Sequence, residues 1–184
     1  MHLLCFVHMH PARCFSFRPC LMTYSINDIS DDPAIQASLL PLNNESARET
    51  SRLNAVKLAR MIEAARVATF AGPGAAFLLA FDQDAAYDSP NFIWFRERFD
   101  SFLYVDRVIV GAAYRRSGLG RLLYEDLFRR AQRLGFRRIA CEVNIRPPNP
   151  VSDAFHARLG FAEVGTATTG DGVKSVRYLM REAL

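Results

Sequence analysis

The sequence predicts a single domain of mixed α/β (α+β) structure, in which strands and helices follow one another along the chain. Residues 102–110 (FLYVDRVIV) are an apolar run rich in aromatic and β-branched residues, which is typical of a buried strand. A helical stripe of apolar residues follows, at Leu119, Leu122, Leu123, Leu127, Ala131 and Leu134. The chain has 184 residues, half of them hydrophobic, so one domain can bury a sizeable core.

The first half of the domain is expected to hold two helices and a hairpin. Residues 23–29 favour a short strand, and the two aspartates before Pro33 are typical of a helix that carries a proline in its first turn. The polar segment 41–49 predicts a loop. A serine cap followed by a periodic apolar side predicts a helix over 51–66. Two apolar runs around a Gly-Pro-Gly turn predict a hairpin over 67–81.

The second half is expected to alternate strands and helices. The helix that carries the apolar stripe should end at Gly135, and residues 138–144 (RIACEVN) predict the next strand. Another helix should follow Asn149, because Asn, Ser and Asp near its start are good caps. Two further strands are expected, at 162–164 and 175–181, on either side of a glycine-rich turn.

Two glycines and three arginines lie at the turn between the apolar run and the helix, in RRSGLGR at 115–121. Glycine lets the backbone approach a ligand closely, and the first N–H groups of a helix have no partner within it. The helix dipole and the arginines add positive charge, which suits a pyrophosphate. A Walker loop needs Gly-Lys-Ser/Thr, and a dinucleotide fingerprint needs a small residue where Leu123 stands, so neither fits. The turn therefore predicts a different phosphate-bearing cofactor.

Residues 149–161 (NPVSDAFHARLGF) supply a second signature, in which Asn149 precedes His156 by seven residues and Leu-Gly-Phe follows. Together with the pattern Arg/Gln-x-x-Gly-x-Gly/Ala at the glycine turn, this segment resembles the GNAT superfamily of acetyl-CoA-dependent N-acetyltransferases. The resemblance covers roughly residues 25–181. It implies a GNAT-like central, mostly antiparallel sheet flanked by helices. Two central strands of that sheet, here 102–110 and 138–144, splay apart around the cofactor.

The resemblance also implies where acetyl-CoA binds. The backbone of the first splayed strand would meet the pantetheine arm, at Val108, Ile109 and Val110. The turn would surround the pyrophosphate, at Arg115, Arg116, Ser117, Gly118, Leu119, Gly120 and Arg121. Asn149 matches the family's asparagine beside the cofactor, and capping of its own helix is a compatible alternative role. No metal is expected.

Three residues are candidates for acid–base catalysis. His156 stands where the family usually has a tyrosine that protonates the leaving thiolate, and histidine can donate a proton near neutral pH. A histidine that merely packs in its helix is the alternative. Glu142 is the candidate base, because burial in an apolar strand raises a carboxyl pKa toward neutrality. An ion pair with an arginine is its alternative, and Asp106 is a second candidate base.

The aromatic stretch at 87–104 (YDSPNFIWFRERFDSFLY) is expected to form a loop and the start of a strand, and its side chains are expected to contribute mainly to the core. The alternative is an aromatic wall around a small cationic amine, with Asp88, Glu97 or Asp100 at its mouth. Cys141, in a predicted strand, is expected to be a small core residue and not a nucleophile.

The first 21 residues differ from the rest, because they contain His2, His8, His10, Cys5, Cys14 and Cys20. Their spacing matches no zinc motif, and the apolar part is too short for a signal peptide. We expect 1–21 to be a loose extension, translated from upstream of a start at Met22, and 22–184 to be the single domain. No apolar stretch is long enough to cross a bilayer, and nothing implies disulfides, so a cytoplasmic protein is expected.

These observations predict an enzyme that transfers the acetyl group of acetyl-CoA directly to a primary amine of a small molecule or peptide, in a ternary complex. A non-catalytic acyl-CoA sensor or interaction module with the same fold is the alternative. The net charge of +4 suits an anionic cofactor and does not require nucleic acid. The nearly exclusive use of arginine over lysine favours a bacterial source, and a homodimer is possible. Contact with nucleic acid is a weaker alternative, through Arg129, Arg130, Arg133, Arg137 and Arg138.

Overall fold

The computed structural model describes residues 24–29, 32–168 and 172–183, and the expected extension at 1–21 lies outside them. The described residues form one seven-stranded sheet with strand order β1-β2-β3-β4-β5-β7-β6. Its strands are β1 (Asn27–Asp28), β2 (Val67–Ala71), β3 (Ala76–Asp82), β4 (Leu103–Val110), β5 (Arg138–Arg146), β6 (Ala162–Thr168) and β7 (Ser175–Glu182). The helices are α1 (Pro33–Glu45), α2 (Ala55–Ala64), α3 (Pro90–Arg96), α4 (Leu119–Leu134) and α5 (Pro150–Arg158), with a 3-10 turn η1 (Ala112–Tyr114). Every neighbouring pair of strands is antiparallel except β4 and β5, so the predicted mixed α/β, mostly antiparallel sheet is confirmed.

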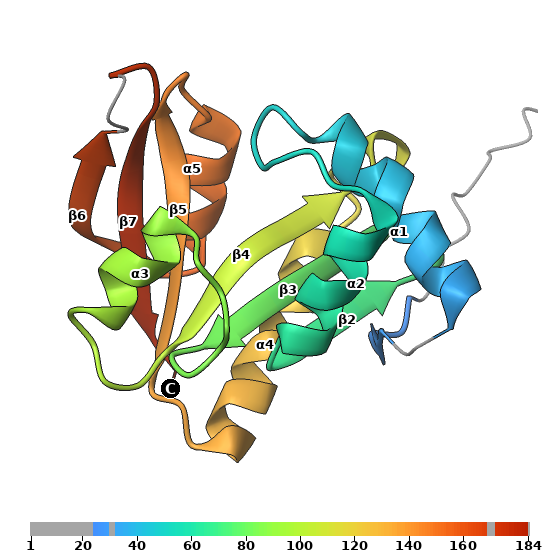
Figure 1. Ribbon diagram of the computed structural model, residues 1–184, viewed down its shortest axis with the longest axis horizontal. Coiled ribbons are helices and arrows are strands. Elements are labelled where there is room, and N and C mark those ends of the chain that lie inside the picture. Colours follow the sequence, from blue (N-terminus) through green and yellow to red (C-terminus); the bar gives the residue numbers. More distant parts are fainter. Residues whose placement is uncertain (1–23, 30–31, 169–171, 184) are drawn as a thin grey trace, which may run out of the picture.

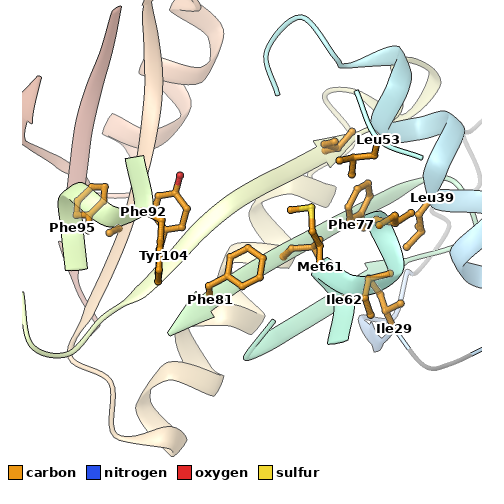
Figure 2. Close-up of a cluster of buried hydrophobic side chains, with 14 of the residues drawn as sticks. Ile29, Leu39, Leu53, Met61, Ile62, Phe77, Phe81, Phe92, Phe95 and Tyr104 are labelled. Atoms are coloured by element: carbon orange, nitrogen blue, oxygen red, sulfur yellow. The ribbon is translucent and has the colours of Figure 1, made fainter. Parts of the chain in front are cut away.

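Helices cover both faces of the sheet, so the core consists of two clusters (Figure 1). On one face α1, α2 and α3 contribute residues such as Leu39, Met61 and Phe95. Figure 2 shows this cluster, which extends from α1 and α2 across the strands to α3. On the other face α4 buries Leu123, and α5 packs Phe155 beside it. A sheet buried on both faces explains why its central strands read as continuous apolar runs in the sequence.

The two central strands β4 and β5 pair over only a short stretch. Their parallel pairing covers Leu103 to Val105 of β4, whereas β4 continues to Val110 and β5 to Arg146. Beyond Val105 the strands diverge, and Figure 1 shows the opening between them. The predicted splay of these strands is therefore confirmed. The divergence begins at a β-bulge, since Val105 and Arg107 have partners on β3 while Asp106, between them, has none.

The structure corrects the expected loop at 41–49. Helix α1 continues to Glu45 even though Pro41 lies inside it, on an exposed position where its missing N–H costs only one helical hydrogen bond. The next turn is held by tertiary contacts. Leu42 is buried, and the Asn43 amide donates to the Ser51 carbonyl at 2.9 Å. These contacts outweigh the local preference of a polar, proline-containing segment.

The second predicted helix is shorter than expected, and a third was missed. Helix α2 begins at Ala55 and ends at Ala64, and the Asn54 side chain, in place of Ser51, caps it by accepting the Lys57 N–H at 2.8 Å. The aromatic stretch at 87–104 contains helix α3, which was expected as loop. Its short length and crowded aromatic residues conceal the helical period.

The apolar stripe of α4 is rotated relative to the predicted one. Leu122 and Leu134 are exposed, whereas Tyr124 and Asp126 are buried together with the other predicted positions. The buried face thus includes a tyrosine hydroxyl. Among the strands, β1 is limited to two residues, and β6 extends to Thr168, beyond the predicted 164.

Candidate active site

The divergence of β4 and β5 leaves a cavity of about 100 Å³ between them, here called the central pocket. The two strands supply Asp106 and Glu142 to its wall, and the loop between α1 and α2 adds Glu49. Tyr124 from α4 and His156 from α5 line the opposite side. Carboxylates, a phenol and an imidazole therefore surround one small space, and these are side chains that act as general acids and bases.

Glu142 is held in the central pocket by two hydrogen bonds. The Tyr104 hydroxyl donates to its Oε2 at 2.6 Å, and the Asn91 amide donates to its Oε1 at 3.1 Å. Tyr178 fixes Asn91 in turn, by donating to the amide oxygen at 3.0 Å. Withdrawal of the carboxylate from water and the negative charge of Asp106 raise the pKa of Glu142 to about 7, against the lowering effect of both donors.

Tyr104 lies on β4 among the aromatic residues of α3, and its hydroxyl emerges from this cluster (Figure 2). Phe92, Phe95 and Tyr104 are fully buried, so these residues belong to the core and do not form an open aromatic slot. Burial and the nearby Glu142 raise the pKa of Tyr104, which keeps it a hydrogen-bond donor at neutral pH.

The second candidate base, Asp106, is already occupied by two partners. The Arg107 guanidinium donates to its Oδ2 at 2.6 Å, and the Tyr87 hydroxyl donates to its Oδ1. Both members of the ion pair are almost completely buried, and Arg107 also donates to Asn43 of α1 at 2.5 Å. Asp106 is therefore committed to a buried ion pair, whereas Glu142 has no ion-pair partner in the described part of the chain.

His156 is buried, and both of its ring nitrogens have partners. Nδ1 lies 2.8 Å from the Ser152 carbonyl oxygen, and Nε2 lies 2.8 Å from the Tyr124 hydroxyl. A carbonyl only accepts, so Nδ1 carries the proton of the neutral ring and Nε2 accepts from Tyr124. Burial lowers the pKa of His156, which favours this neutral form, while the Ser152 hydrogen bond and Asp153 act in the opposite direction.

Cys141 lies on β5 beside Tyr124 and is buried, as expected for a core residue. Burial and the neighbouring Glu142 raise the pKa of its thiol. The thiolate is the nucleophilic form of cysteine, and it is suppressed here, so Cys141 is poorly suited to carry an acyl group.

The glycine turn joins η1 to α4 and opens toward solvent. Gly118 precedes the helix at φ 89°, in the left-handed region, and Arg116 has φ 62°. Arg115 and Arg116 are exposed and form no ion pair within the described ranges, whereas Arg121 pairs with Glu125 at 2.7 Å. The first N–H groups of α4, from Leu119 to Arg121, have no acceptor within their helix.

The other residues implied by the resemblance lie close to this turn. A Cβ on Gly120 would lie 3.4 Å from the Phe155 ring and 3.7 Å from Val110, so the glycine permits close packing of α4 on α5. The Ser117 hydroxyl donates to the Tyr114 carbonyl at 2.5 Å. Leu119 is buried at the start of the helix. The turn is therefore fixed by its own contacts while its backbone faces outward.

The backbone of β4 presents its free edge to the opening. The Gly111 N–H donates to Ala75 of β3 at 2.8 Å. Because successive residues of a strand point their N–H groups to opposite sides, Ile109 also faces β3, and Val108 and Val110 face the side that β5 has left. Val108 and Val110 thus offer unpaired backbone groups, while the Ile109 side chain is buried against the helices of the other face.

Asn149 has the capping role that was one of the two expected for it, and it lies at the pocket. Its side chain caps α5, because Oδ1 accepts the Ser152 N–H at 3.1 Å. It also lines the central pocket. The amide NH2 has no hydrogen-bond partner in the described part of the chain, so it remains available as a donor.

Tyr124 and Asn91 matter to the pocket and were not predicted, whereas Tyr104 and Tyr87 were expected mainly as core residues. Tyr124 could have been found from its place beside Leu123 in the helical stripe, where a tyrosine must bury its hydroxyl with a partner. Asn91 could not have been found, since the helix that carries it was expected as loop. The arginines considered for nucleic acid contact are partly engaged elsewhere, because Arg129, Arg130 and Arg138 form ion pairs with Asp126, Asp28 and Glu182.

Within the ranges that the structure describes, no cluster of His, Cys, Asp or Glu could hold a metal ion. A membrane span is likewise not found there, since each described helix is too short or too polar to cross a bilayer.

Comparison with known proteins supports the resemblance. The model of the acetyltransferase (GNAT) family matches residues 86–161, which include α3, β4, the glycine turn, α4, β5 and α5. No curated protein matches the chain significantly. Among solved structures, the ribosomal-protein-S18-alanine N-acetyltransferase from Escherichia coli is similar, with a TM-score of 0.63 and 18% identity over 88% of this chain and 94% of that one.

Two more solved structures share the architecture. A GCN5-related N-acetyltransferase from Kribbella flavida has a TM-score of 0.63 at 22% identity, covering 86% of this chain and 97% of its own. An aminoglycoside 6'-N-acetyltransferase complexed with coenzyme A has a TM-score of 0.66 at 13% identity, covering 87% and 97%. At such identities the likeness establishes the fold and leaves the acceptor open. The fold, the family match over residues 86–161 and the two signatures agree, and together they support membership of the GNAT superfamily.

Proposed function

We propose that this protein is an N-acetyltransferase that moves the acetyl group of acetyl-CoA directly to a primary amine, in a ternary complex without an acyl-enzyme. The observation that carries the proposal is the central pocket, where Glu142 has a pKa of about 7 and lies between strands that diverge beside the glycine turn. A base poised near neutral pH is suited to deprotonating an ammonium group. The raised pKa of the Cys141 thiol supports direct transfer.

Several features of the chain fit acetyl-CoA as the donor. The free edge of β4 at Val108 and Val110 matches the amides of the pantetheine arm. The first turn of α4 and the unpaired Arg115 and Arg116 match the pyrophosphate. Asn149 retains free amide donors at the pocket wall. Similar solved structures contain coenzyme A, including the aminoglycoside acetyltransferase.

Transfer requires two proton movements, and the chain supplies a group for each. Glu142 takes a proton from the acceptor ammonium, and the freed nitrogen forms a bond to the acetyl carbon while the carbon–sulfur bond breaks. The departing thiolate needs a proton. We propose that the thiolate takes the proton of the Tyr124 hydroxyl, which lines the pocket, and that His156 returns a proton to the Tyr124 oxygen through Nε2. This step uses the protonated ring, the form that the Ser152 hydrogen bond and Asp153 favour against the effect of burial.

Ligand-dependent stability tests the donor site. Acetyl-CoA at about 100 times Kd should stabilise the wild type by about 2.7 kcal/mol, which raises Tm by several degrees. The Gly120→Glu variant should lose this shift, because a larger side chain at the Phe155 and Val110 contact places a negative charge at the turn. Gln132→Glu is the matched control, since it adds the same charge at an exposed site later in α4. If saturating acetyl-CoA does not raise the Tm of the wild type, the proposed function is wrong.

Turnover tests the catalytic roles. His156→Phe and Tyr124→Phe should each lower kcat by about a hundredfold, the usual contribution of a general acid, and should retain the stabilisation by acetyl-CoA. Wild-type rates in either variant would contradict the proton path.

One observation favours the alternative of a non-catalytic acyl-CoA sensor. His156 stands in place of the usual tyrosine, and its Nε2 is already hydrogen-bonded to Tyr124. A protein that is stabilised by acetyl-CoA but acetylates no amine in a broad screen would be such a sensor. We keep the cytoplasm as the proposed location and an amine of a small molecule or peptide as the general acceptor.

A further inference from the structure

A second cavity lies beside the central pocket, between α2 and the segment that leads into α3. Its volume is about 670 Å³, and its wall includes Lys57, Arg60, Arg96, Tyr87 and Asp88. We call it the basic groove. Figure 1 shows α2 and α3 on the same face of the sheet, with the chain between β3 and α3 running between them. None of the residues expected to bind acetyl-CoA lines the basic groove.

The size of the central pocket implies that an acceptor needs additional space. Pockets that enclose small-molecule ligands commonly measure about 300–1,000 Å³. The central pocket, at about 100 Å³, has room for the reacting ends only, whereas the basic groove is within the usual range. The two cavities share a wall, because Tyr87 lines the groove and its hydroxyl donates to Asp106, which lines the pocket. The groove therefore adjoins the pocket, and an acceptor that passes over the Tyr87–Asp106 pair can place its amine in the pocket and its body in the groove.

The two cavities carry opposite charge. Glu49, Asp106 and Glu142 line the central pocket, with Arg107 as the only cation among its lining residues. The groove instead has three cations and the single carboxylate of Asp88.

The cations of the groove are also available to a ligand. Lys57 and Arg60 are one helical turn apart on α2, and Arg96 faces them from α3. All three are exposed, and none forms an ion pair in the described part of the chain, although Arg96 lies over the Phe92 ring. Opposite potentials in adjoining cavities are complementary to a ligand that carries both charges.

We propose that the acceptor is a small molecule that carries both a primary amine and a carboxylate or phosphate. This inference rests on the proposed function. The amine enters the central pocket, and the anionic group binds Lys57 and Arg60 in the basic groove. The reaction remains the transfer described above: a carbon–nitrogen bond forms, the carbon–sulfur bond breaks, Glu142 receives the ammonium proton and the thiolate is protonated. The anionic group takes no part in the chemistry and contributes through binding.

Acceptor series of graded length test the proposal. We would measure kcat/KM for alkylamines, for ω-amino carboxylates and for ω-aminoalkyl phosphates of the same chain lengths. At the best length the wild type should prefer an anionic acceptor over the alkylamine by about tenfold, the combined strength of two exposed ion pairs. The preference should appear mainly in KM and should shrink as salt is added. Comparison of the carboxylates with the phosphates identifies which anion the groove takes.

Charge reversal on α2 locates the effect. In the double variant Lys57→Glu/Arg60→Glu, the ratio of kcat/KM for the anionic acceptor to that for the alkylamine of the same length should fall by about tenfold, which removes the preference. The double variant Arg133→Glu/Arg137→Glu is the control, since it makes the same change in net charge at exposed positions remote from the groove. This control should keep the preference.

Several outcomes would overturn the proposal. If acetyl-CoA stabilises the protein and amines are acetylated, but the anionic acceptors are not preferred, this inference is wrong and the proposed function stands. The same holds if the α2 variant keeps the preference for anionic acceptors. A strong preference for peptide N-termini over every small acceptor would also overturn it. If neither stabilisation by acetyl-CoA nor transfer to any amine is found, the proposed function and this inference fail together.

Discussion

The pH dependence of acetyl transfer should respond in opposite directions to two changes around Glu142. If this carboxylate is the base, kcat/KM rises with pH through its pKa, which is about 7 in the free protein. The Tyr104 hydroxyl stabilises the charged form through a 2.6 Å hydrogen bond, whereas the negative charge of Asp106 destabilises it. Tyr104→Phe should therefore move the rising limb to higher pH, and Asp106→Asn should move it to lower pH.

The size of the first shift follows from the bond that is lost. A hydrogen bond to a charged group contributes about 1.5–3 kcal/mol, and one pH unit corresponds to 1.36 kcal/mol, so Tyr104→Phe should shift the limb by about one to two units. The ring of Tyr104 is fully buried and is kept in this variant, which limits other changes. The assay is release of free thiol from acetyl-CoA under kcat/KM conditions across the range from mildly acidic to mildly basic pH.

A graded control separates a direct from an indirect effect. Tyr178→Phe removes a hydroxyl that donates to Asn91 and does not donate to Glu142, so its shift should be smaller than that of Tyr104→Phe. An unmoved limb in both Tyr104→Phe and Asp106→Asn would refute the assignment of Glu142. So would a Glu142→Gln variant that keeps the wild-type rate and the same limb.

Three further predictions concern stability. The unfolded chain loses the Glu142 proton near pH 4.5 and the folded chain loses it near pH 7, so the unfolding free energy of the wild type should fall by up to about 3 kcal/mol as the pH rises through this interval. Glu142→Gln should remove this part of the decline in urea titrations. An unchanged dependence of the unfolding free energy on pH would contradict the raised pKa. Gly165→Ala should lower Tm by several degrees, at a cost of about 1–3 kcal/mol, because its Cβ would lie 2.6 Å from the Trp94 ring; the exposed Thr166→Ala serves as its control, and an unaltered Tm would show that the ring yields freely. Gly118→Ala should destabilise by about 1–2 kcal/mol through its φ of 89° alone, since its Cβ meets nothing within 4 Å; chemical denaturation measures this cost, and full stability of the variant would mean that the turn relaxes.

The order of strands and helices could be predicted because most of these elements carry their own local signals. The apolar run at 102–110, the Gly-Pro-Gly hairpin and the glycine after α4 appear in the structure close to the expected places. Prediction failed where distant contacts decide the local structure. Helix α1 continues past Pro41 because Asn43 bonds the Ser51 carbonyl, and these groups meet only in the fold. Such tertiary effects routinely override propensity.

The candidate site divides in the same way. Glu142 and His156 could be selected from their positions in a strand and a helix signature, and the structure brings both to one pocket. Their partners come from elsewhere in the chain. Asn91 reaches Glu142 from a helix whose short aromatic sequence hides its period, and Asp106 faces Glu142 because a bulge changes the alternation of β4. A period-two pattern carries no sign of a bulge, so sequence alone could not have placed this carboxylate.

The replacement of a tyrosine by His156 should be considered together with Tyr124. An imidazole extends less far from the backbone than a phenol, so His156 alone would leave its proton short of a site that a tyrosine reaches. Tyr124 lies on the neighbouring helix with its hydroxyl 2.8 Å from Nε2, and it lines the same pocket. The Ser152 carbonyl fixes the imidazole from the other side, at 2.8 Å. The pair thus restores a hydroxyl at the pocket, with a titratable group behind it. On the proposed proton path the two residues act as a unit, so the double variant Tyr124→Phe/His156→Phe should be little slower than either single one.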